Sequence, residues 1–443
     1  MDAENAASEL DPSGELGGIT SDCVHCGFCL PACPTYQLWG EEMDSPRGRI
    51  HLISQLLEGA TASPAAASHL DRCLGCMACV PACPSGVRYD RLIEAARSWA
   101  AEPVPALPAR SPRERALRTA IFSTFPYPAR LRMLMAPLRA AQRSGIDRLL
   151  ARSTAAARFA PELAAALRVA PGRESVRAPR GRLPERVAAR GERRAVVGML
   201  TGCVQQVFFQ PVNIATARVL AAEGCDVVIP RTQGCCGALS LHDGRRAEAG
   251  RFAAGLIETF ERAQVDAIVV NSAGCGSAMK EYGGLLADDP CWADRAAALS
   301  AKVADLSEFL VRLGPAATRH PLPVSVAYHD ACHLAHAQRI TSEPRELLKA
   351  IPELTVLEVS DAGTCCGSAG IYNLVQPKTA RELGARKAAA VSATRADLVV
   401  SANPGCSLQI GSALADAGTP LPVAHLAEVL DTSIRGIPAS ALL

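Results

Sequence analysis

The 443-residue sequence lacks any run of 18 or more apolar residues. An α-helix needs about 20 apolar residues to cross a bilayer, so no spanning helix is expected. The first twenty residues, MDAENAASELDPSGELGGIT, lack both the basic start and the apolar centre of a secretion signal. The sequence therefore predicts a protein that stays in the cytosol.

The sequence also lacks the short motifs of nucleotide and hydrolase sites. It contains no G-x-G-x-x-G fingerprint, no Walker loop and no G-x-S-x-G elbow. With 49% apolar and 20% charged residues it is globular, and its length predicts two to four domains. We therefore assign no catalytic residue and no nucleic-acid partner to this chain.

Cysteine, by contrast, is abundant, with 18 residues. Cytosolic thiols are kept reduced, so metal binding is the leading explanation for so many. CVHCGFCLPACP begins at Cys23 and CLGCMACVPACP at Cys73, and both have the C-x2-C-x2-C-x3-C-P spacing of bacterial ferredoxins. In two-cluster ferredoxins the fourth cysteine serves the other cluster. The spacing predicts two crossed [4Fe-4S] sites: Cys23, Cys26, Cys29 and Cys83 in the first; Cys73, Cys76, Cys79 and Cys33 in the second.

A longer repeat organises the second half of the chain. Cysteines recur at an offset of 129 to 131 residues, which predicts one site from Cys203, Cys235, Cys236 and Cys275 and another from Cys332, Cys365, Cys366 and Cys406. β-Rich runs such as RAVVGML and DLVVSAN end at these cysteines, and helical stretches lie between them. VADLSEFL and VAHLAEVL form a further matched pair. Two α/β units with parallel sheets are expected, with the cysteines at the carboxyl ends of the strands.

The Cys…CCG…Gly-Cys copies resemble the cysteine-rich CCG domains of heterodisulfide reductase and related iron–sulfur subunits. That family's fuller motif ends in CxxC and gives five cysteines per site, whereas this sequence has Ala278 and Gln409 at the fifth positions. The resemblance thus implies four thiolates per site, which suit a [4Fe-4S] cube or a zinc ion. Cys225 and Cys291 have no counterpart in the other copy and are expected to be buried small hydrophobes.

Residues 101–194 have a different composition, with 20 arginines, no lysine and 7 acidic residues. FPYPARLRMLMAPLRAAQ predicts a broken amphipathic helix. Such basic helices bind anionic membrane surfaces, and a linker that packs on acidic partners or on its own domains is the alternative.

Taken whole, the chain resembles the iron–sulfur subunit of bacterial glycolate oxidase. The segments that carry the likeness include DCVHCGFCLPACPTYQLWGEEMDSPRGRIHLI and HLDRCLGCMACVPACPSGVRYDRLIE. The anchor subunit of anaerobic glycerol-3-phosphate dehydrogenase shares the architecture, and a lactate dehydrogenase subunit or a disulfide reductase also remains open. The resemblance implies an α+β multidomain fold: a ferredoxin-like domain (15–100), a helical basic linker (101–194) and two CCG domains (195–318 and 319–443).

The resemblance also implies partners. Flavoprotein subunits that bind FAD would oxidise the 2-hydroxy acid, and this chain would pass electrons toward the quinone pool from the cytoplasmic face of the membrane.

For some polar residues near the cysteines, the sequence allows two roles. His329, His333 and His336 could bind metal or support the cluster thiolates, and Arg47 and Arg49 could hydrogen-bond near a cluster or cap a helix.

Overall fold

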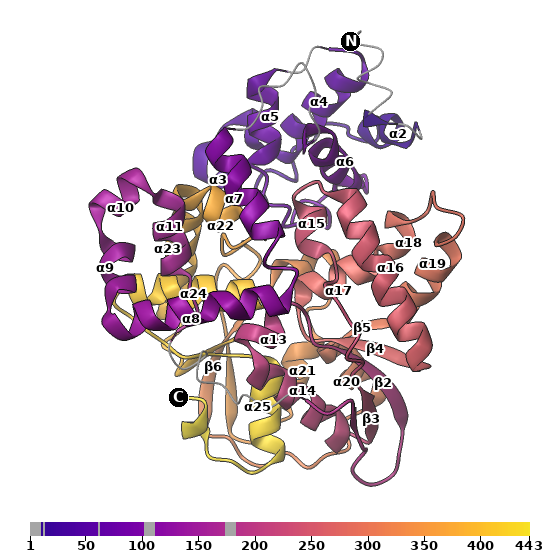
Figure 1. Cartoon of the computed structure of the whole chain (residues 1–443), viewed down its shortest axis with the longest axis vertical. Coiled ribbons are helices and arrows are strands. Elements are labelled where there is room, and N and C mark those ends of the chain that lie inside the picture. Colours follow the sequence, from indigo (N-terminus) through magenta and orange to yellow (C-terminus); the bar gives the residue numbers. More distant parts are fainter. Residues whose placement is uncertain (1–9, 12–13, 61–62, 102–110, 173–182) are drawn as a thin grey trace.

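The computed structural model describes residues 10–11, 14–60, 63–101, 111–172 and 183–443. Most of the N-terminal stretch and two parts of the basic segment, 102–110 and 173–182, lie outside the described residues. None of the described helices is long and apolar enough to cross a membrane. In Figure 1 the N-terminal helices lie above two α/β units, and the helices of the basic segment run along one side.

The N-terminal domain is a small helical body that holds two cysteine loops. Its helices are α2 (Glu15–Ser21), α3 (Pro34–Trp39), α4 (Pro46–Leu57), α5 (Pro64–Asp71) and α6 (Tyr89–Ala101), with a 3-10 turn η1 (Glu42–Asp44). Ile53, Leu92 and Ile93 are fully buried in its core. One cysteine loop follows α2 and the other follows α5, so each loop begins just after the C-terminal end of a short helix.

The two loops share one unusual backbone conformation. Left-handed φ angles occur at His25 (53°) and Gly27 (83°) in the first loop, and at Gly75 (60°) and Met77 (60°) in the second. These positions correspond at the 50-residue offset of the repeat. Each loop therefore makes the same two left-handed turns, with glycine at one and a strained non-glycine residue at the other.

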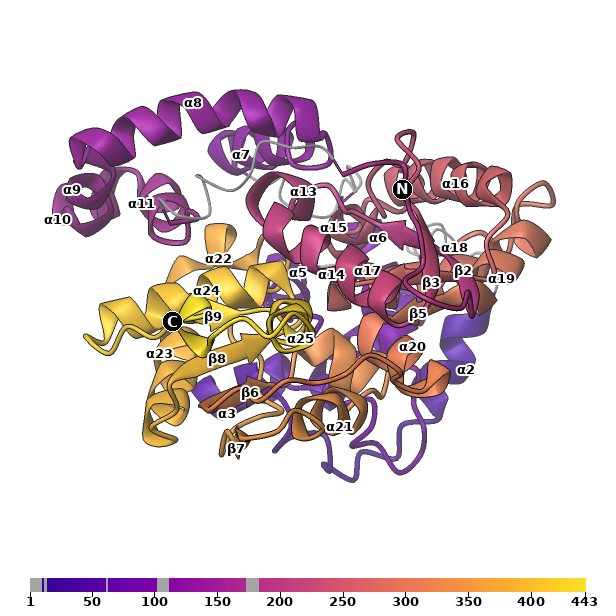
Figure 2. The same ribbon diagram turned by 90° about the horizontal axis from the view of Figure 1, so that it is seen from below.

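The described parts of the basic segment form five helices, and these pack on both α/β units. They are α7 (Pro112–Phe122), α8 (Pro128–Ser144), α9 (Ile146–Arg152), α10 (Thr154–Phe159) and α11 (Pro161–Arg168). Figure 2 shows α8 lying over α13. Ion pairs join Arg118 to Asp243 and Arg168 to Asp416, the latter at 3.0 Å. The alternative of a linker that packs on its own domains is thus realised for these residues.

One expectation for this segment was wrong, because α8 is not broken. The helix continues through Pro137, which is exposed. Because proline has no N–H, the carbonyl of Met133 loses its helical hydrogen-bond partner, and Met133 is also exposed. Solvent can therefore satisfy that carbonyl, and the helix tolerates the proline.

The first α/β unit has a five-stranded sheet in the order β1-β3-β2-β4-β5, parallel except for β1. Its strands are β1 (Arg186–Val187), β2 (Ala195–Leu200), β3 (Cys225–Val228), β4 (Ala267–Val270) and β5 (Val303–Asp305). Its helices are α13 (Gln205–Phe208), α14 (Gln210–Ala222), α15 (Ala238–His242), α16 (Arg246–Ala263), α17 (Ala273–Lys280), α18 (Tyr282–Leu285), α19 (Ala293–Lys302) and α20 (Leu306–Leu313). Strand β1 lies within the range expected for the linker.

The second unit repeats this pattern with a parallel sheet in the order β7-β6-β8-β9. Its strands are β6 (Val324–His329), β7 (Leu354–Glu358), β8 (Leu398–Ser401) and β9 (Val423–Ala424). A π-helix η2 (His333–Ala337), helices α21 (Glu343–Lys349), α22 (Tyr372–Val375), α23 (Pro377–Ala393), α24 (Pro404–Asp416) and α25 (Leu426–Ile434), and a 3-10 turn η3 (Ala439–Ala441) complete it. The fold class expected from the sequence is confirmed.

The two units share one core and pack reciprocally. Helix α14 packs on α25, and its counterpart α21 packs on α20. The VADLSEFL and VAHLAEVL pair begins equivalent helices, because Asp305 and His425 each cap a helix in a capping box. Val197 and Leu310 of the first unit lie in the same buried cluster as Val326 and Leu430 of the second. The carboxyl ends of both sheets are therefore held at fixed positions relative to each other.

Candidate metal centres

The first ferredoxin-type loop contributes its cysteines to one small cavity. Cys23, Cys26, Cys29 and Cys83 all line it, together with Cys79. Cys26 is exposed, and Cys23, Cys29 and Cys83 are half-buried. The backbone of the loop is supported by Arg47, which donates to the His25 carbonyl at 3.0 Å and pairs with Glu42 at 2.7 Å. The His25 side chain itself is exposed.

The second loop gathers around Cys33 and is buried. Cys33, Cys73, Cys76 and Cys79 are all buried. Burial and the charges of neighbouring thiols, Cys33 among them, raise the pKa of Cys76 and of Cys79. Cys83 therefore lies with the first loop, whereas the charge of Cys33 acts on Cys29 of its own loop as well as on Cys76 and Cys79. The assignment of ligands remains a prediction.

From a fully buried position, Arg49 hydrogen-bonds the segment after the first loop and the helix before the second. It donates to the His69 carbonyl at 2.7 Å, to the Asp44 carbonyl at 2.6 Å and to Thr35 Oγ1 at 3.2 Å. Burial alone would raise the pKa of Cys73, but the charges of Arg49 and Arg97 outweigh it and lower that pKa. Ser45, and not an arginine, caps α4. Arg49 therefore serves the cluster loops electrostatically.

The four cysteines of the first α/β unit converge at the ends of its strands. Cys203 follows β2, the Cys235–Cys236 pair follows β3, and Cys275 lies in the first turn of α17 after β4. The Sγ atoms of Cys203 and Cys235 are 3.5 Å apart. This contact raises the pKa of Cys203 and lowers that of Cys235, while the Cys235 and Cys275 thiols raise that of Cys236.

The second unit brings its four cysteines together in the same way, and all four are buried. The Cys365 thiol interacts with those of Cys332 and Cys366, and Cys366 also interacts with Cys406. Asn403 donates to Cys406 Sγ at 3.4 Å. Each set is a continuous group of sulfur atoms. Thiolates held so close repel one another unless a cation lies between them, so both sets fit a metal centre.

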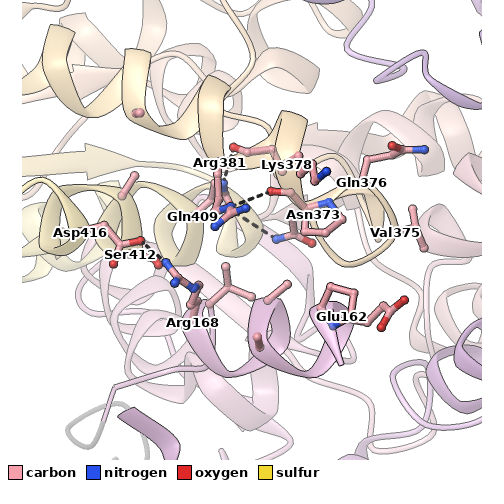
Figure 3. Close-up of a pocket in the computed structure, with 18 of the residues that line it drawn as sticks. Glu162, Arg168, Asn373, Val375, Gln376, Lys378, Arg381, Gln409, Ser412 and Asp416 are labelled. Atoms are coloured by element: carbon pink, nitrogen blue, oxygen red, sulfur yellow. Dashed lines mark hydrogen bonds and ion pairs between the residues drawn. The ribbon is translucent and has the colours of Figure 1, made fainter. Parts of the chain in front are cut away.

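Gln409, at the position of the family's fifth cysteine, makes hydrogen bonds of its own. Its amide donates to the Ala380 carbonyl at 2.9 Å and accepts from Asn373 at 3.2 Å. Figure 3 shows both side chains lining a groove of about 510 Å³ between α11 and helices α23 and α24, beside the Arg168–Asp416 pair. This residue therefore stabilises packing between helices.

The candidate centres meet where the three domains join. Leu74 and Cys76 of the second ferredoxin-type loop lie in one buried cluster with Cys332 and Cys365. Asn403 Oδ1, beside Cys406, accepts from the backbone N–H of Gly274, next to Cys275, at 3.3 Å. These contacts connect the N-terminal loop to the second unit's site, and that site to the first unit's.

The three candidate histidines lie in different surroundings. His336 Nε2 lies 2.8 Å from the Gly363 carbonyl, and His333 Nδ1 lies 3.5 Å from Cys332 Sγ. His329 is 1% exposed, and neither of its ring nitrogens has a hydrogen-bond partner. Burial and the charge of Lys387 lower its pKa to about 3, so the ring is neutral. One atom from each of His329, Cys366 and Cys406 lies within 4.8 Å of the others.

Two residues near these sites were missed from the sequence. The ring of His242 meets that of His333 edge to face with centroids 4.6 Å apart, and no local motif indicates this contact. Lys387 is fully buried on the inner face of α23, where helical periodicity predicts an apolar residue.

Among the unmatched cysteines, Cys225 is buried as expected. The expectation for Cys291 was wrong: it is exposed, in a turn between α18 and α19 where its N–H bonds to Asp289.

Comparisons with known proteins agree with this architecture. A 4Fe-4S dicluster domain model matches residues 19–87, and a cysteine-rich domain model matches twice, at 197–280 and 326–411. The chain is thus an iron–sulfur protein with a ferredoxin-type domain and two CCG domains. A third model, the linker region of the glycolate oxidase iron–sulfur subunit, matches residues 113–170.

The relatives then identify the family. The chain is 39% identical to the "probable glycolate oxidase iron-sulfur subunit" of Bacillus subtilis (strain 168), over 96% of each chain. It is 36% identical to the glycolate oxidase iron-sulfur subunit of Escherichia coli (strain K12), over 90% of this chain and 91% of that one. It is also 31% identical to lactate utilization protein A of Exiguobacterium sp., over 54% of this chain and 98% of that protein. The chain belongs to the family of glycolate oxidase iron–sulfur subunits and is part of an oxidoreductase complex.

Proposed function

We propose that the chain conducts electrons from a partner flavoprotein that oxidises glycolate, or a closely related 2-hydroxy acid, toward membrane quinone. Two [4Fe-4S] clusters bind in the N-terminal domain, on the crossed sets Cys23, Cys26, Cys29 with Cys83 and Cys73, Cys76, Cys79 with Cys33. The CCG sets, Cys203, Cys235, Cys236 with Cys275 and Cys332, Cys365, Cys366 with Cys406, bind further iron–sulfur centres. The names of the relatives support the substrate class.

The packing of Cys76 against Cys332 and Cys365 carries this proposal. Electron transfer needs closely spaced centres, and this contact joins the second ferredoxin-type site directly to the site of the second α/β unit. The first ferredoxin-type site is more exposed, with Cys26 at the surface. Electrons therefore enter at the first loop, cross to the second and continue to the CCG sites.

The residues of this chain hold and tune the centres. When bound, a [4Fe-4S] cluster accepts and releases one electron at a time. Oxidation of a 2-hydroxy acid to a 2-oxo acid releases two electrons and two protons to the partner's flavin, and the reduction of quinone consumes two of each. Arg49 and Arg97, which favour the thiolate of Cys73, also favour the added electron at the second site.

Purification of the native complex tests the proposal. We expect a flavoprotein to co-purify, and the clusters to be reduced by glycolate when that partner is present but not by the isolated chain. The same assay with lactate separates the glycolate and lactate classes, because only the true substrate reduces the clusters within the turnover time. Absence of a flavoprotein, or reduction of a disulfide acceptor by the isolated chain, would overturn it.

Metal analysis tests the CCG centres separately. Iron well above eight atoms per chain supports iron–sulfur centres there, because two [4Fe-4S] clusters account for eight. Eight irons with added zinc would instead make the CCG sites structural and confine electron transfer to the N-terminal domain.

We further propose that the basic segment docks on the cytoplasmic face of the membrane. Leu131 and Met135 of α8 are buried against Phe208, so they are not part of this docking face. Exposed large apolar side chains nevertheless remain on these helices: Met133, Leu134, Ile146, Leu149, Leu150, Phe159 and Leu163. Exposed arginines, such as Arg130, Arg132 and Arg143, lie among them, and Arg139 is half-buried. Apolar area mixed with positive charge suits an anionic lipid surface.

Sedimentation with anionic phospholipid vesicles tests the docking. We expect the complex to bind at low salt and to be released by moderate salt, because exposed charges are screened beyond roughly 10 Å at 0.1 M. Met133→Gln with Leu134→Gln should weaken binding and lower quinone-linked activity more than activity with a soluble dye. Ala136→Gln, on an exposed position of the same helix, is the matched control. Equal losses in both assays would show that this face contacts a protein subunit instead.

A further inference from the structure

The two α/β units differ at one position beside their cysteine sites. In the first sheet Leu200 pairs in register with Val270, and in the second His329 pairs with Ser401. Leu200 and His329 each lie three residues before the first cysteine of their site. His329 therefore occupies the position that an apolar side chain fills in the other unit.

A second difference lies on the helix that packs behind the CCG loop. A Cβ atom on Gly237 would meet Ala249 of α16, and one on Gly367 would meet Ala380 of α23. Ala249 and Ala380 are therefore equivalent positions, each packed against the glycine of a CCG motif. Leu256 lies seven residues after Ala249, and Lys387 lies seven residues after Ala380, so the two are equivalent positions. Both side chains are completely buried. The second unit has thus replaced two apolar core residues with an imidazole and an amine.

The imidazole has no structural partner to account for it. Lys387 donates to the Asp361 carbonyl, whereas neither nitrogen of His329 has a hydrogen-bond partner. Leaving a buried polar group unpaired destabilises the fold, so a histidine that served packing alone would be worse than the leucine of the other unit. Cys366 and Cys406 supply two thiol ligands within 4.8 Å of the ring.

We propose that His329 is a fifth ligand of the site formed by Cys332, Cys365, Cys366 and Cys406, and binds the metal centre through its imidazole. The inference rests on the proposal that these cysteines hold a metal. Gln409 leaves the second site without the fifth cysteine of the fuller family motif, and its amide is committed to Ala380 and Asn373. The first unit has Ala278 at the position of the fifth cysteine and Leu200 at the position of His329, so its site keeps four thiolates.

The two sites then differ in charge as well as in ligands. An imidazole ligand is neutral, so as a fifth ligand it adds a nitrogen donor to the four thiolates without adding charge. Lys387 adds a buried positive charge near the same site. The second unit's centre is therefore the stronger electron acceptor of the two, and it is the one in contact with the N-terminal domain.

Magnetic resonance on the full chain tests the ligand directly. Protein labelled with 15N-histidine and poised so that the CCG centres are paramagnetic should show a strong nitrogen coupling by pulsed electron paramagnetic resonance. If the site holds zinc, X-ray absorption at the zinc edge should show one nitrogen at about 2.0 Å beside sulfurs at about 2.3 Å. Both measurements use the unmodified sequence, so they do not depend on the folding of a variant.

Variants then assign the nitrogen. His329→Leu, which restores the residue of the other unit, should abolish the coupling. Ser401→Val, which makes the same kind of exchange at the register partner, and His333→Gln should retain it. A coupling that persists in His329→Leu, or a metal centre without nitrogen in the unmodified chain, would overturn the inference. If Cys332→Ser leaves the metal content of the chain unchanged, the metal site itself is overturned, and the inference about His329 falls with it.

Discussion

The charge of Arg49 should set the reduction potential of the second ferredoxin-type cluster. Arg49 Nη1 and Cys33 Sγ each lie 3.2 Å from Thr35 Oγ1, so they are within about 6 Å of each other. At an effective dielectric constant of about 20, a unit charge at that distance contributes roughly 2.8 kcal/mol. For one electron this corresponds to roughly 120 mV.

The observed shift should be smaller, because the added electron spreads over the cube and Asp44 keeps its pairs with Arg72 and His69. We expect Arg49→Gln to lower the potential of the second cluster by about 50–100 mV. Redox titration followed by electron paramagnetic resonance measures it. Arg47→Gln, on the same helix but partly exposed and paired with Glu42, is the matched control and should leave the second cluster unchanged. An unchanged potential in a folded, fully loaded Arg49→Gln chain would refute the reasoning.

Three further predictions concern ligands, packing and pH. Cys33→Ser should remove the cluster of Cys73, Cys76 and Cys79 while the other spectrum persists; loss of the first cluster alone would contradict the crossed sets. Gly48→Ala should lower the free energy of unfolding by about 1–3 kcal/mol, since its Cβ would lie 2.0 Å from the Glu42 carbonyl oxygen; an unchanged denaturation midpoint would contradict this. Burial lowers the pKa of His425 to about 4, so its contribution to stability is complete above pH 6.5 and is lost as the pH falls through 4, by about 3 kcal/mol at most. Unfolding followed from pH 7 to 4 should be flatter in His425→Gln, and parallel curves would show that another group is responsible.

Much of the site could be predicted because its signals are local. Short β-rich runs that end at a cysteine place each thiol at the end of a strand, and repetition at a fixed offset pairs the sets. The matched pair VADLSEFL and VAHLAEVL could also be recognised in the sequence. The capping boxes at Asp305 and His425 lie within one helical turn of each motif.

Features that depend on distant contacts could not be predicted. An amphipathic pattern gives α8 an apolar face, but nothing local says that Phe208 covers Leu131 and Met135 while Met133 stays exposed. The sequence singles out His329 near Cys332, but it cannot choose between metal binding and support of the thiolates until the register with Ser401 and the distance to Cys366 are known. Each of these contacts joins segments that are far apart in the sequence, such as α8 with α13 and β6 with β8, so only the folded chain decides them.

The burial of Cys332 and Cys365 beneath the second ferredoxin-type loop has a consequence for biogenesis. That loop leaves the ribosome first, yet its docking closes the site that is synthesised last. A metal centre on the C-terminal cysteines, as proposed above, would therefore have to be assembled before the N-terminal domain packs against them. On that proposal, maturation would follow an order opposite to synthesis, with the C-terminal centre completed before the first-made domain docks.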